Sequence, residues 1–190
     1  FYIPLEGGYD YCVLEYSFSV WQWGKKIESI PEATAPDDVL LNELIQVVGP
    51  EYFSTKGDTP FFAQAYRELG YYGYDLKPFK PYLTIKSAKN YVRDVMLPAN
   101  LRGIKFDKTV SKHITQYLKK NDPQMICIYG EIDPWTAAGV TWLNKYKKNN
   151  LKVYIKPRGS HSTRIANMPE DMRNEILATL SNWLNEPIIK

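Results

Sequence analysis

This chain of 190 residues is long enough for one large domain or two small ones, and its 44% hydrophobic residues are sufficient for a core. Its formal net charge of +3, from 24 basic and 21 acidic side chains, is too balanced to indicate a nucleic-acid-binding protein. The sequence contains neither a signal peptide nor an apolar run of the roughly 18 residues that a membrane span needs.

The first part of the chain has helical patterns separated by loops. A lead-in punctuated by Pro and Gly, residues 1–10, precedes the aromatic stretch Tyr11–Gly24, which is apolar on nearly every side and should be a buried helix. An amphipathic helix with an acidic first turn is predicted over Asp37–Val48. The start signal Asp-Thr-Pro and a closing glycine predict a further helix over Asp58–Gly70. Tyr71–Leu83 is predicted to be an extended loop.

Three more helices are predicted from caps and apolar stripes. Ser87 is expected to begin a short helix that ends at Met96, and Asp107 to cap a helix over Lys108–Lys120. A long final helix is expected from Met168 to Asn185. The stripe of the helix after Asp107 consists of Val110, Ile114, Tyr117 and Leu118, and that of the final helix of Met172, Ile176, Leu180, Trp183 and Leu184.

Two β-prone apolar runs lie near the C-terminus. Met125–Tyr129 and Leu151–Lys156 are separated by Thr136–Lys148, which has helical spacing, and a strand–helix–strand unit joins parallel strands. The loops that follow two parallel strands leave the sheet at the same edge. Because neighbouring strands lie about 5 Å apart, we expect Asp133 and His161, which follow these strands, to come within side-chain reach of each other.

An Asp beside a His at this edge is two-thirds of a hydrolytic triad. In this interpretation Asp133 accepts a hydrogen bond from the imidazole of His161 and stabilises the imidazolium that forms when His161 takes a proton from a serine. Gly130 and Pro134 would fix the turn that aims the acid, and Gly159 would let the backbone turn before the histidine. Alternatively, Asp133 is a turn residue or the cap of the next helix, and His161 is a solvated loop residue.

The third member of a triad is missing. No G-x-S-x-G occurs in the sequence, Ser17 and Ser19 lie in the aromatic helix, and Ser160 and Ser162 flank the histidine itself. In the chain order serine, acid, histidine the serine comes first, so we expect it upstream of Phe1. Since the chain does not begin with Met, we expect its native N-terminus to have been cut away.

Other site chemistries have no support in the sequence. Both cysteines, Cys12 and Cys127, lie in apolar stretches and should be small buried hydrophobic residues rather than a disulfide. His113, the second histidine, lies in a Lys-rich helix. No His, Cys and Asp residues have metal-ligand spacing, and no glycine-rich phosphate loop occurs. We therefore expect neither a metal nor a cofactor.

A lone pair of parallel strands is poorly protected, because parallel sheets normally have further strands beside them and helices on both faces. We therefore expect an α/β fold in which this chain is the C-terminal part of a larger protein. Residues 1–120 would form a mostly helical lid, and residues 121–190 would form the last two parallel strands with flanking helices.

Four segments resemble a known family. GEIDPWTAAGV (Gly130–Val140) and GSHSTR (Gly159–Arg164) are similar to the acid and histidine segments of the secreted serine tripeptidyl (prolyl-type) aminopeptidases, relatives of lysosomal Pro-Xaa carboxypeptidase and dipeptidyl peptidase II. FAQAYRELGYY (Phe62–Tyr72) and YDYCVLEYSFSVWQWG (Tyr9–Gly24) resemble the lid of that wider group. The resemblance covers nearly the whole chain, and the family's N-terminal half, with the nucleophile, has no counterpart here. It implies an α/β-hydrolase fold and a secreted or periplasmic location.

The resemblance implies specific roles. Asp133 and His161 would be the triad acid and base, and Trp135, beside the acid, would contact substrate. An exopeptidase must recognise a charged terminus, so a lid carboxylate is expected to bind the α-amino group of the peptide. Glu15 and Glu68 are the candidates, because both lie among aromatic residues, and Glu68 is preferred. The alternative for Glu68 is an ordinary helix carboxylate paired with its neighbour Arg67 or with solvent.

Three functions remain open at this point. The first is part of a serine exopeptidase that removes short peptides, tripeptides above all, from free N-termini; this part would be inactive alone. The second is another hydrolase of the same fold, such as an esterase. The third is a non-catalytic module that binds a peptide or glycan, which a separation of more than about 7 Å between Asp133 and His161 would favour. The partners expected are a peptide substrate, the N-terminal half of the same protein, and a second copy that covers an exposed apolar face or sheet edge.

Overall fold

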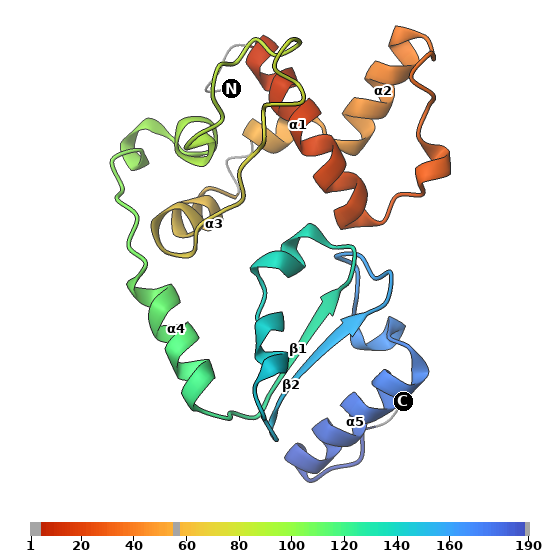
Figure 1. The fold of residues 1–190 in the computed structure, drawn as a ribbon, viewed down its shortest axis with the longest axis vertical. Coiled ribbons are helices and arrows are strands. Elements are labelled where there is room, and N and C mark those ends of the chain that lie inside the picture. The colour runs from red at the N-terminus through yellow and green to blue at the C-terminus, as the bar shows by residue number, and fades with distance from the viewer. Residues whose placement is uncertain (1–4, 55–57, 189–190) are drawn as a thin grey trace. The chain divides into compact units, whose positions relative to one another are not determined.

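The computed structural model describes residues 5–54 and 58–188. They form a mixed α/β chain that is mostly helical, with two parallel strands near the C-terminus (Figure 1), as the sequence predicts. The chain divides into two compact units, the first comprising Phe1–Ser19 and Lys26–Ile114 and the second Val20–Lys25 and Thr115–Lys190. The second unit thus includes the end of the aromatic helix, which the expected boundary after residue 120 had assigned to the lid.

The first unit is helical. Helix α1 (Leu5–Trp23) begins earlier than predicted and includes part of the lead-in with Gly7 and Gly8, although a glycine costs roughly 1 kcal/mol in a helix. Its end is less buried than predicted, since Trp21 and Trp23 are 46% and 60% exposed. The other elements of the unit are α2 (Asp37–Val47), α3 (Thr59–Gln64) and π-helical turns at Ala65–Leu69 and Val92–Met96.

An aromatic cluster forms the core of this unit. Tyr11 packs on Phe53 and Tyr91 at ring-centroid distances of 5.6 and 5.7 Å, and Leu97 is fully buried. Cys12 is a buried free thiol whose pKa burial raises to about 11, as expected of a small core residue.

The helix predicted from Ser87 to Met96 is mostly absent. The hydroxyl of Ser87 accepts a hydrogen bond from the backbone N–H of Lys89, which closes a local turn instead of capping a helix. Asn90 then adopts a left-handed conformation with φ 62°, and helical hydrogen bonds begin only near Val92.

The second unit contains the parallel pair. Strands β1 (Met125–Gly130) and β2 (Leu151–Lys156) lie in register from Met125 opposite Leu151 to Gly130 opposite Lys156. The crossover between them was predicted as a single helix and is two 3₁₀ turns, Pro134–Ala138 and Thr141–Lys145.

Tyr129 explains why the crossover is broken. A Cβ at Gly139, between the two turns, would lie 2.5 Å from the ring of Tyr129, so the backbone packs directly on that ring. The Tyr129 hydroxyl then accepts a hydrogen bond of 2.9 Å from the N–H of Val140, which a continuous α-helix would use internally. A tertiary contact therefore overrides the helical pattern of the sequence.

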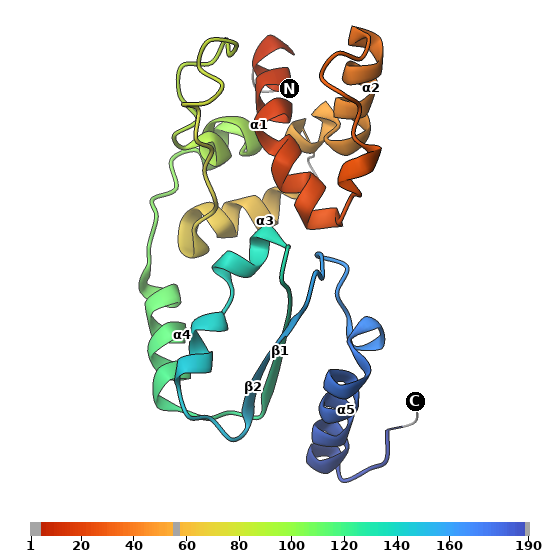
Figure 2. The same cartoon turned by 45° about the vertical axis from the view of Figure 1, so that its right-hand side comes forward.

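Apolar side chains cover both faces of the strand pair. Leu143 of the crossover packs with Leu151, and on the other face Ile176 of helix α5 (Glu170–Leu184) packs with Tyr154. Figures 1 and 2 show the crossover on one side of the two strands and α5 on the other. Ile176 is fully buried as its stripe predicts, whereas Leu184, at the end of α5, is 64% exposed.

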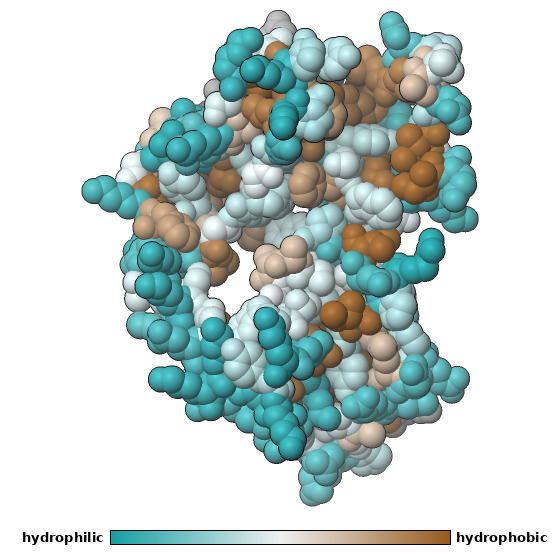
Figure 3. Space-filling model, in the orientation of Figure 1, coloured by the Kyte–Doolittle hydropathy of each residue, from teal (hydrophilic) through white to brown (hydrophobic). Residues whose placement is uncertain are grey.

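Helix α4 (Thr109–Lys120) begins as predicted, since Asp107 accepts hydrogen bonds from the N–H and the hydroxyl of Thr109. Its apolar stripe, however, is buried only at Leu118, whereas Tyr117 is 53% exposed. Figure 3 shows apolar patches among the polar surface of one face of the molecule. In the described part of the chain, no helix has both the length and the apolar character that crossing a membrane requires.

Candidate active site

The turn after β1 fixes Asp133. The side chain is 8% exposed, and its Oδ1 accepts a hydrogen bond of 3.1 Å from the N–H of Trp135. Asp133 is thus the N-cap of the 3₁₀ turn that begins at Pro134, as the structural alternative predicted. Because this bond uses only one carboxylate oxygen, the other remains available for a partner across the sheet edge.

That partner is His161. Its Nδ1 lies 2.8 Å from Oδ2 of Asp133, within the range of a strong charge-assisted hydrogen bond. The expected proximity of these two side chains is therefore confirmed, and Asp133 caps the turn and bonds the imidazole at the same time. A carboxylate on Nδ1 fixes the tautomer in which Nδ1 carries a proton and leaves Nε2 as the acceptor.

The two turns are also joined through their backbones. The N–H of Ile132 donates to the carbonyl of Gly159 at 3.0 Å, and the N–H of Arg158 donates to the carboxylate of Glu131 at 2.7 Å. The acid and the histidine are therefore held by hydrogen bonds around the pair, so their contact does not depend on side-chain rotamers alone.

Gly130 serves a different purpose from the predicted one. It does not have a positive φ, so the turn does not need its conformational freedom. Instead, a Cβ on Gly130 would meet the Gly159 carbonyl oxygen and lie 2.5 Å from that of Ser160. Gly159 is equally constrained, because its Cβ would lie 2.6 Å from Oγ1 of Thr163. Gly130 thus permits the close approach of the two turns, and Gly159 permits close packing within the histidine turn.

A pocket of about 340 Å³ lies beside the pair, with Trp135, Ser160 and Arg164 in its lining. The ring centroid of Trp135 is 5.6 Å from that of His161. Trp135 thus lies beside His161, and its predicted contact with substrate stays a prediction.

No serine of the described residues is placed to act as a nucleophile beside His161. Ser160 and Ser162 flank the histidine and hydrogen-bond to each other through their hydroxyls at 2.8 Å. Within the described ranges, no serine hydroxyl is hydrogen-bonded to Nε2 of His161, and no group of three or more His, Cys, Asp or Glu residues could hold a metal ion.

Sequence reasoning missed a second aromatic residue that contacts the histidine. The indole of Trp23, at the end of α1, meets the imidazole edge-to-face at a centroid distance of 5.6 Å. The backbone N–H of His161 also donates a hydrogen bond of 2.7 Å to the backbone carbonyl of Gln22. No spacing rule connects residues this far apart in the sequence, so only the tertiary structure reveals the contact.

Glu15 belongs to the first unit and lies in a cage of hydroxyl groups. Its carboxylate is 2% exposed and accepts hydrogen bonds from Tyr72 at 2.7 Å, from Tyr74 at 2.6 Å and from Ser19 at 3.4 Å. In the described residues no cationic side chain forms an ion pair with it. Burial raises the pKa of Glu15, and the hydrogen bonds of the two tyrosines and Ser19 oppose that rise.

Glu68 has a different environment. Its carboxylate is 3.5 Å from Nε of Arg67, and its side chain is 25% exposed. Its carbonyl oxygen also accepts a hydrogen bond of 2.6 Å from the hydroxyl of Ser111. This is the arrangement of the alternative interpretation, a helix carboxylate paired with the neighbouring arginine.

The raised pKa of Glu15 has a consequence for stability. A carboxyl whose folded pKa exceeds its unfolded value contributes stability fully below the unfolded pKa, and that contribution is lost as pH rises through the folded pKa. We expect Glu15→Gln to remove this loss, so wild type should lose stability relative to the variant as pH rises above about 4.5. Urea titrations at several pH values, followed by the near-UV signal of the tyrosines, measure it. Glu32→Gln, at an exposed loop position, is the control, and parallel stability curves for wild type and Glu15→Gln would contradict the expectation.

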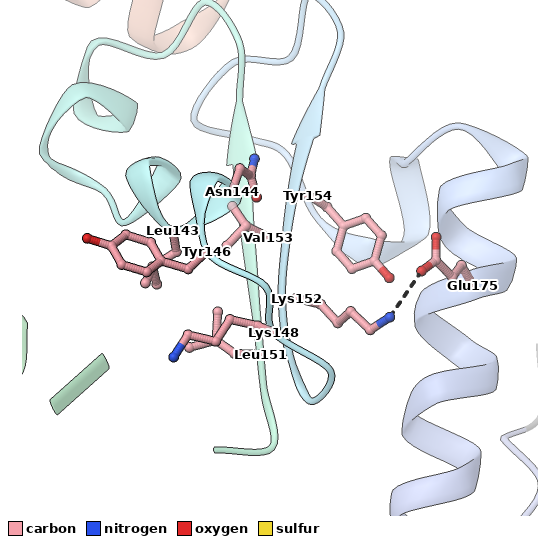
Figure 4. Close-up of a pocket in the computed structure, with 9 residues that line it drawn as sticks. All are labelled: Leu143, Asn144, Tyr146, Lys148, Leu151, Lys152, Val153, Tyr154 and Glu175. Carbon is pink, nitrogen blue, oxygen red and sulfur yellow. Dashed lines mark ion pairs between the residues drawn. The ribbon is translucent and has the colours of Figure 1, made fainter. Parts of the chain in front are cut away.

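A second pocket, of about 320 Å³, lies along β2 (Figure 4). Nζ of Lys152 is 3.6 Å from Oε1 of Glu175, and the Tyr154 hydroxyl points toward the same helix, α5. Burial, with Glu175 nearby, raises the pKa of Tyr154 to about 12, so this hydroxyl stays neutral. Lys148 donates to the carbonyl oxygens of Lys119 and Asn121. Both lysines are therefore engaged in polar contacts within the protein, whereas the buried hydroxyl of Tyr154 has no hydrogen-bond partner among the described residues.

Comparison of the chain with protein families, curated sequences and solved structures finds no match. The functional assignment therefore depends on the geometry of the site and on the segment resemblance.

Proposed function

We propose that this chain is part of a serine exopeptidase of the α/β-hydrolase type, which removes short peptides, tripeptides above all, from free N-termini. The observation that supports the proposal most directly is the 2.8 Å contact between Asp133 and His161 at the carboxyl ends of two parallel strands. The distance is far below the 7 Å that would favour a binding module. The substrate class is proposed from the similarity of Gly130–Val140 and Gly159–Arg164 to secreted tripeptidyl aminopeptidases, and the lid segments resemble those of the wider group.

The proposed chemistry is an acyl-enzyme mechanism. Nε2 of His161 takes the proton of a serine hydroxyl as its oxygen attacks the peptide carbonyl carbon, and then gives that proton to the leaving amine when the C–N bond breaks. Water next attacks the acyl ester, loses its proton to His161, and the serine regains its hydrogen as the ester bond breaks. Asp133 stays ionised and stabilises the imidazolium throughout.

The serine and the oxyanion-hole donors are proposed to come from a segment that precedes Phe1. A G-x-S-x-G motif between a strand and a helix in that segment would place the nucleophile at the carboxyl edge of the same sheet. Such an enzyme would act outside the cytoplasm, in line with the secreted family that the segments resemble.

The test compares this chain with a longer polypeptide that includes the residues before Phe1. We expect the longer polypeptide to hydrolyse chromogenic tripeptide substrates with free N-termini, and this chain alone to hydrolyse none, because a triad without its nucleophile cannot form the acyl-enzyme. Robust peptidase activity from this chain alone would refute the assignment of roles. Cleavage of esters but not of peptides by the longer polypeptide would assign it to the esterases.

We further propose Glu15, rather than the preferred candidate Glu68, as the group that binds the substrate's ammonium. Glu68 is already beside Arg67, whereas among the described residues the partners of the Glu15 carboxylate are neutral hydroxyl groups. A buried carboxylate whose pKa is raised by burial gains from a bound cation, because the cation offsets the cost of removing the charge from water. Because Glu15 is 2% exposed, an ammonium would replace the hydrogen bond of a tyrosine hydroxyl.

The substitution Glu15→Gln in the longer polypeptide tests this role. We expect kcat/KM for peptides with a free N-terminus to fall about 100-fold, the loss of one charge-assisted hydrogen bond in a desolvated site, and that for N-acetylated peptides to change little. Glu68→Gln is the matched control and should leave the ratio between the two substrates unchanged. Equal losses on both substrates in Glu15→Gln, or selective loss in Glu68→Gln, would contradict the choice of Glu15.

A further inference from the structure

The last turn of α1 lies against the turn that carries His161, and both belong to the second unit. The backbone carbonyl of Gln22 accepts a hydrogen bond of 2.7 Å from the backbone N–H of His161. Gly24 ends the helix in a left-handed conformation with φ 69°, and a Cβ there would lie 3.1 Å from Cβ of Ser160. The histidine turn is therefore packed against the helix end as well as against the turn of Asp133.

The imidazole of His161 is in ring contact with two indoles. The centroids of the Trp23 and Trp135 rings are each 5.6 Å from that of His161, with interplanar angles of 82° and 53°. Trp23 is 60% exposed, so burial of its own surface does not explain its position. Its ring contact among the described residues is with the histidine.

These contacts restrict motions that the bond to Asp133 leaves free. A single hydrogen bond at Nδ1 of His161 permits the imidazole to swing about the axis of that bond. Contacts with two indole rings limit that swing.

We propose that Trp23 is a positioning residue, which together with Trp135 and Asp133 holds the His161 imidazole with Nε2 directed toward the reacting groups. The positioning itself stands on the contacts of the second unit. Its effect on turnover rests on the proposed hydrolase function, since only a base that must meet a nucleophile gains rate from a fixed orientation.

The first experiment uses this 190-residue chain and requires no activity. Proton NMR compares the imidazole protons of His161 with those of His113, which has no ring contact within the described ranges. In Trp23→Leu we expect the His161 ring protons to shift toward the His113 values and the His161 amide to exchange about fivefold faster. Trp23→Phe should retain most of the wild-type pattern. Trp21→Leu, at a position 46% exposed on the same helix, should retain all of it.

The second experiment uses the longer polypeptide that supplies the nucleophile. Trp23→Leu should lower kcat about tenfold and change KM less than about twofold, with most of the rate restored in Trp23→Phe. Unchanged His161 protons in Trp23→Leu would overturn the positioning, and shifted protons with wild-type kcat would overturn its effect on turnover. If the wild-type longer polypeptide hydrolyses neither peptides nor esters, the hydrolase proposal fails, and the NMR comparison alone decides the positioning.

Discussion

Replacing Asp133 by Asn in the longer polypeptide should lower kcat for peptide hydrolysis about 10,000-fold, the loss measured when a triad acid is replaced in this way. Oδ2 of Asp133 lies 2.8 Å from Nδ1 of His161 and stabilises both the correct tautomer and the imidazolium. An amide in its place can donate to Nδ1 and so favours the tautomer in which Nε2 carries the proton and cannot accept one. His161→Gln should cost at least as much.

Steady-state kinetics with a tripeptide substrate measure this effect, and circular dichroism checks that the variants fold. The control is His113→Gln, because His113 is an exposed residue of α4 and should leave kcat unchanged. A loss of less than tenfold in Asp133→Asn would leave Asp133 as a structural cap of the next turn, with His161 as an ordinary loop residue.

Gly130→Ala should destabilise the second unit by about 3 kcal/mol. The added methyl group would lie against the carbonyl oxygens of Gly159 and Ser160, which belong to the backbone and cannot rotate away as a side chain would. The two turns must then separate, and the contact between Asp133 and His161 is lost with the packing. The variant should therefore be inactive in the longer polypeptide even where it remains folded.

Urea denaturation followed by tryptophan fluorescence measures this loss of stability. Gly103→Ala is the matched control, because no atom lies within 4 Å of the Cβ position at Gly103, and we expect its stability to stay within about 0.5 kcal/mol of wild type. Wild-type stability in Gly130→Ala would show that the turns can separate freely and that glycine is not required for their approach.

Much of the local structure could be predicted because it follows from short-range rules. Residues Leu151–Lys156 alternate between two buried faces and form β2 over the predicted range. Asp107 caps α4 through a bond to a residue two positions away, which any chain with that sequence can form. One prediction failed through a tertiary contact, because the ring of Tyr129 divides the crossover at Gly139. Another failed locally, because Ser87 closes a turn with Lys89 instead of capping a helix.

By itself the sequence determined the parallel pair and the proximity of Asp133 and His161. A strand, a crossover and a second strand make a parallel pair, and the loops that follow two parallel strands leave the sheet at one edge. The same logic indicated that a nucleophile was absent, since no serine lies between a strand and a helix.

Only the tertiary structure decided the surroundings of that pair. Trp23, near the start of the sequence, contacts the imidazole of His161. Gly130 is packed against the backbone of Gly159 and Ser160, where a side chain would not fit. The tertiary structure also shows that two carboxylates with similar sequence surroundings have different environments. Glu15 is buried among tyrosine hydroxyls, and Glu68 lies beside an arginine. The burial of Glu15, the backbone approach to Gly130 and the contact of Trp23 with His161 all depend on which segments pack together in space. The spacing of these residues along the chain does not predict that packing.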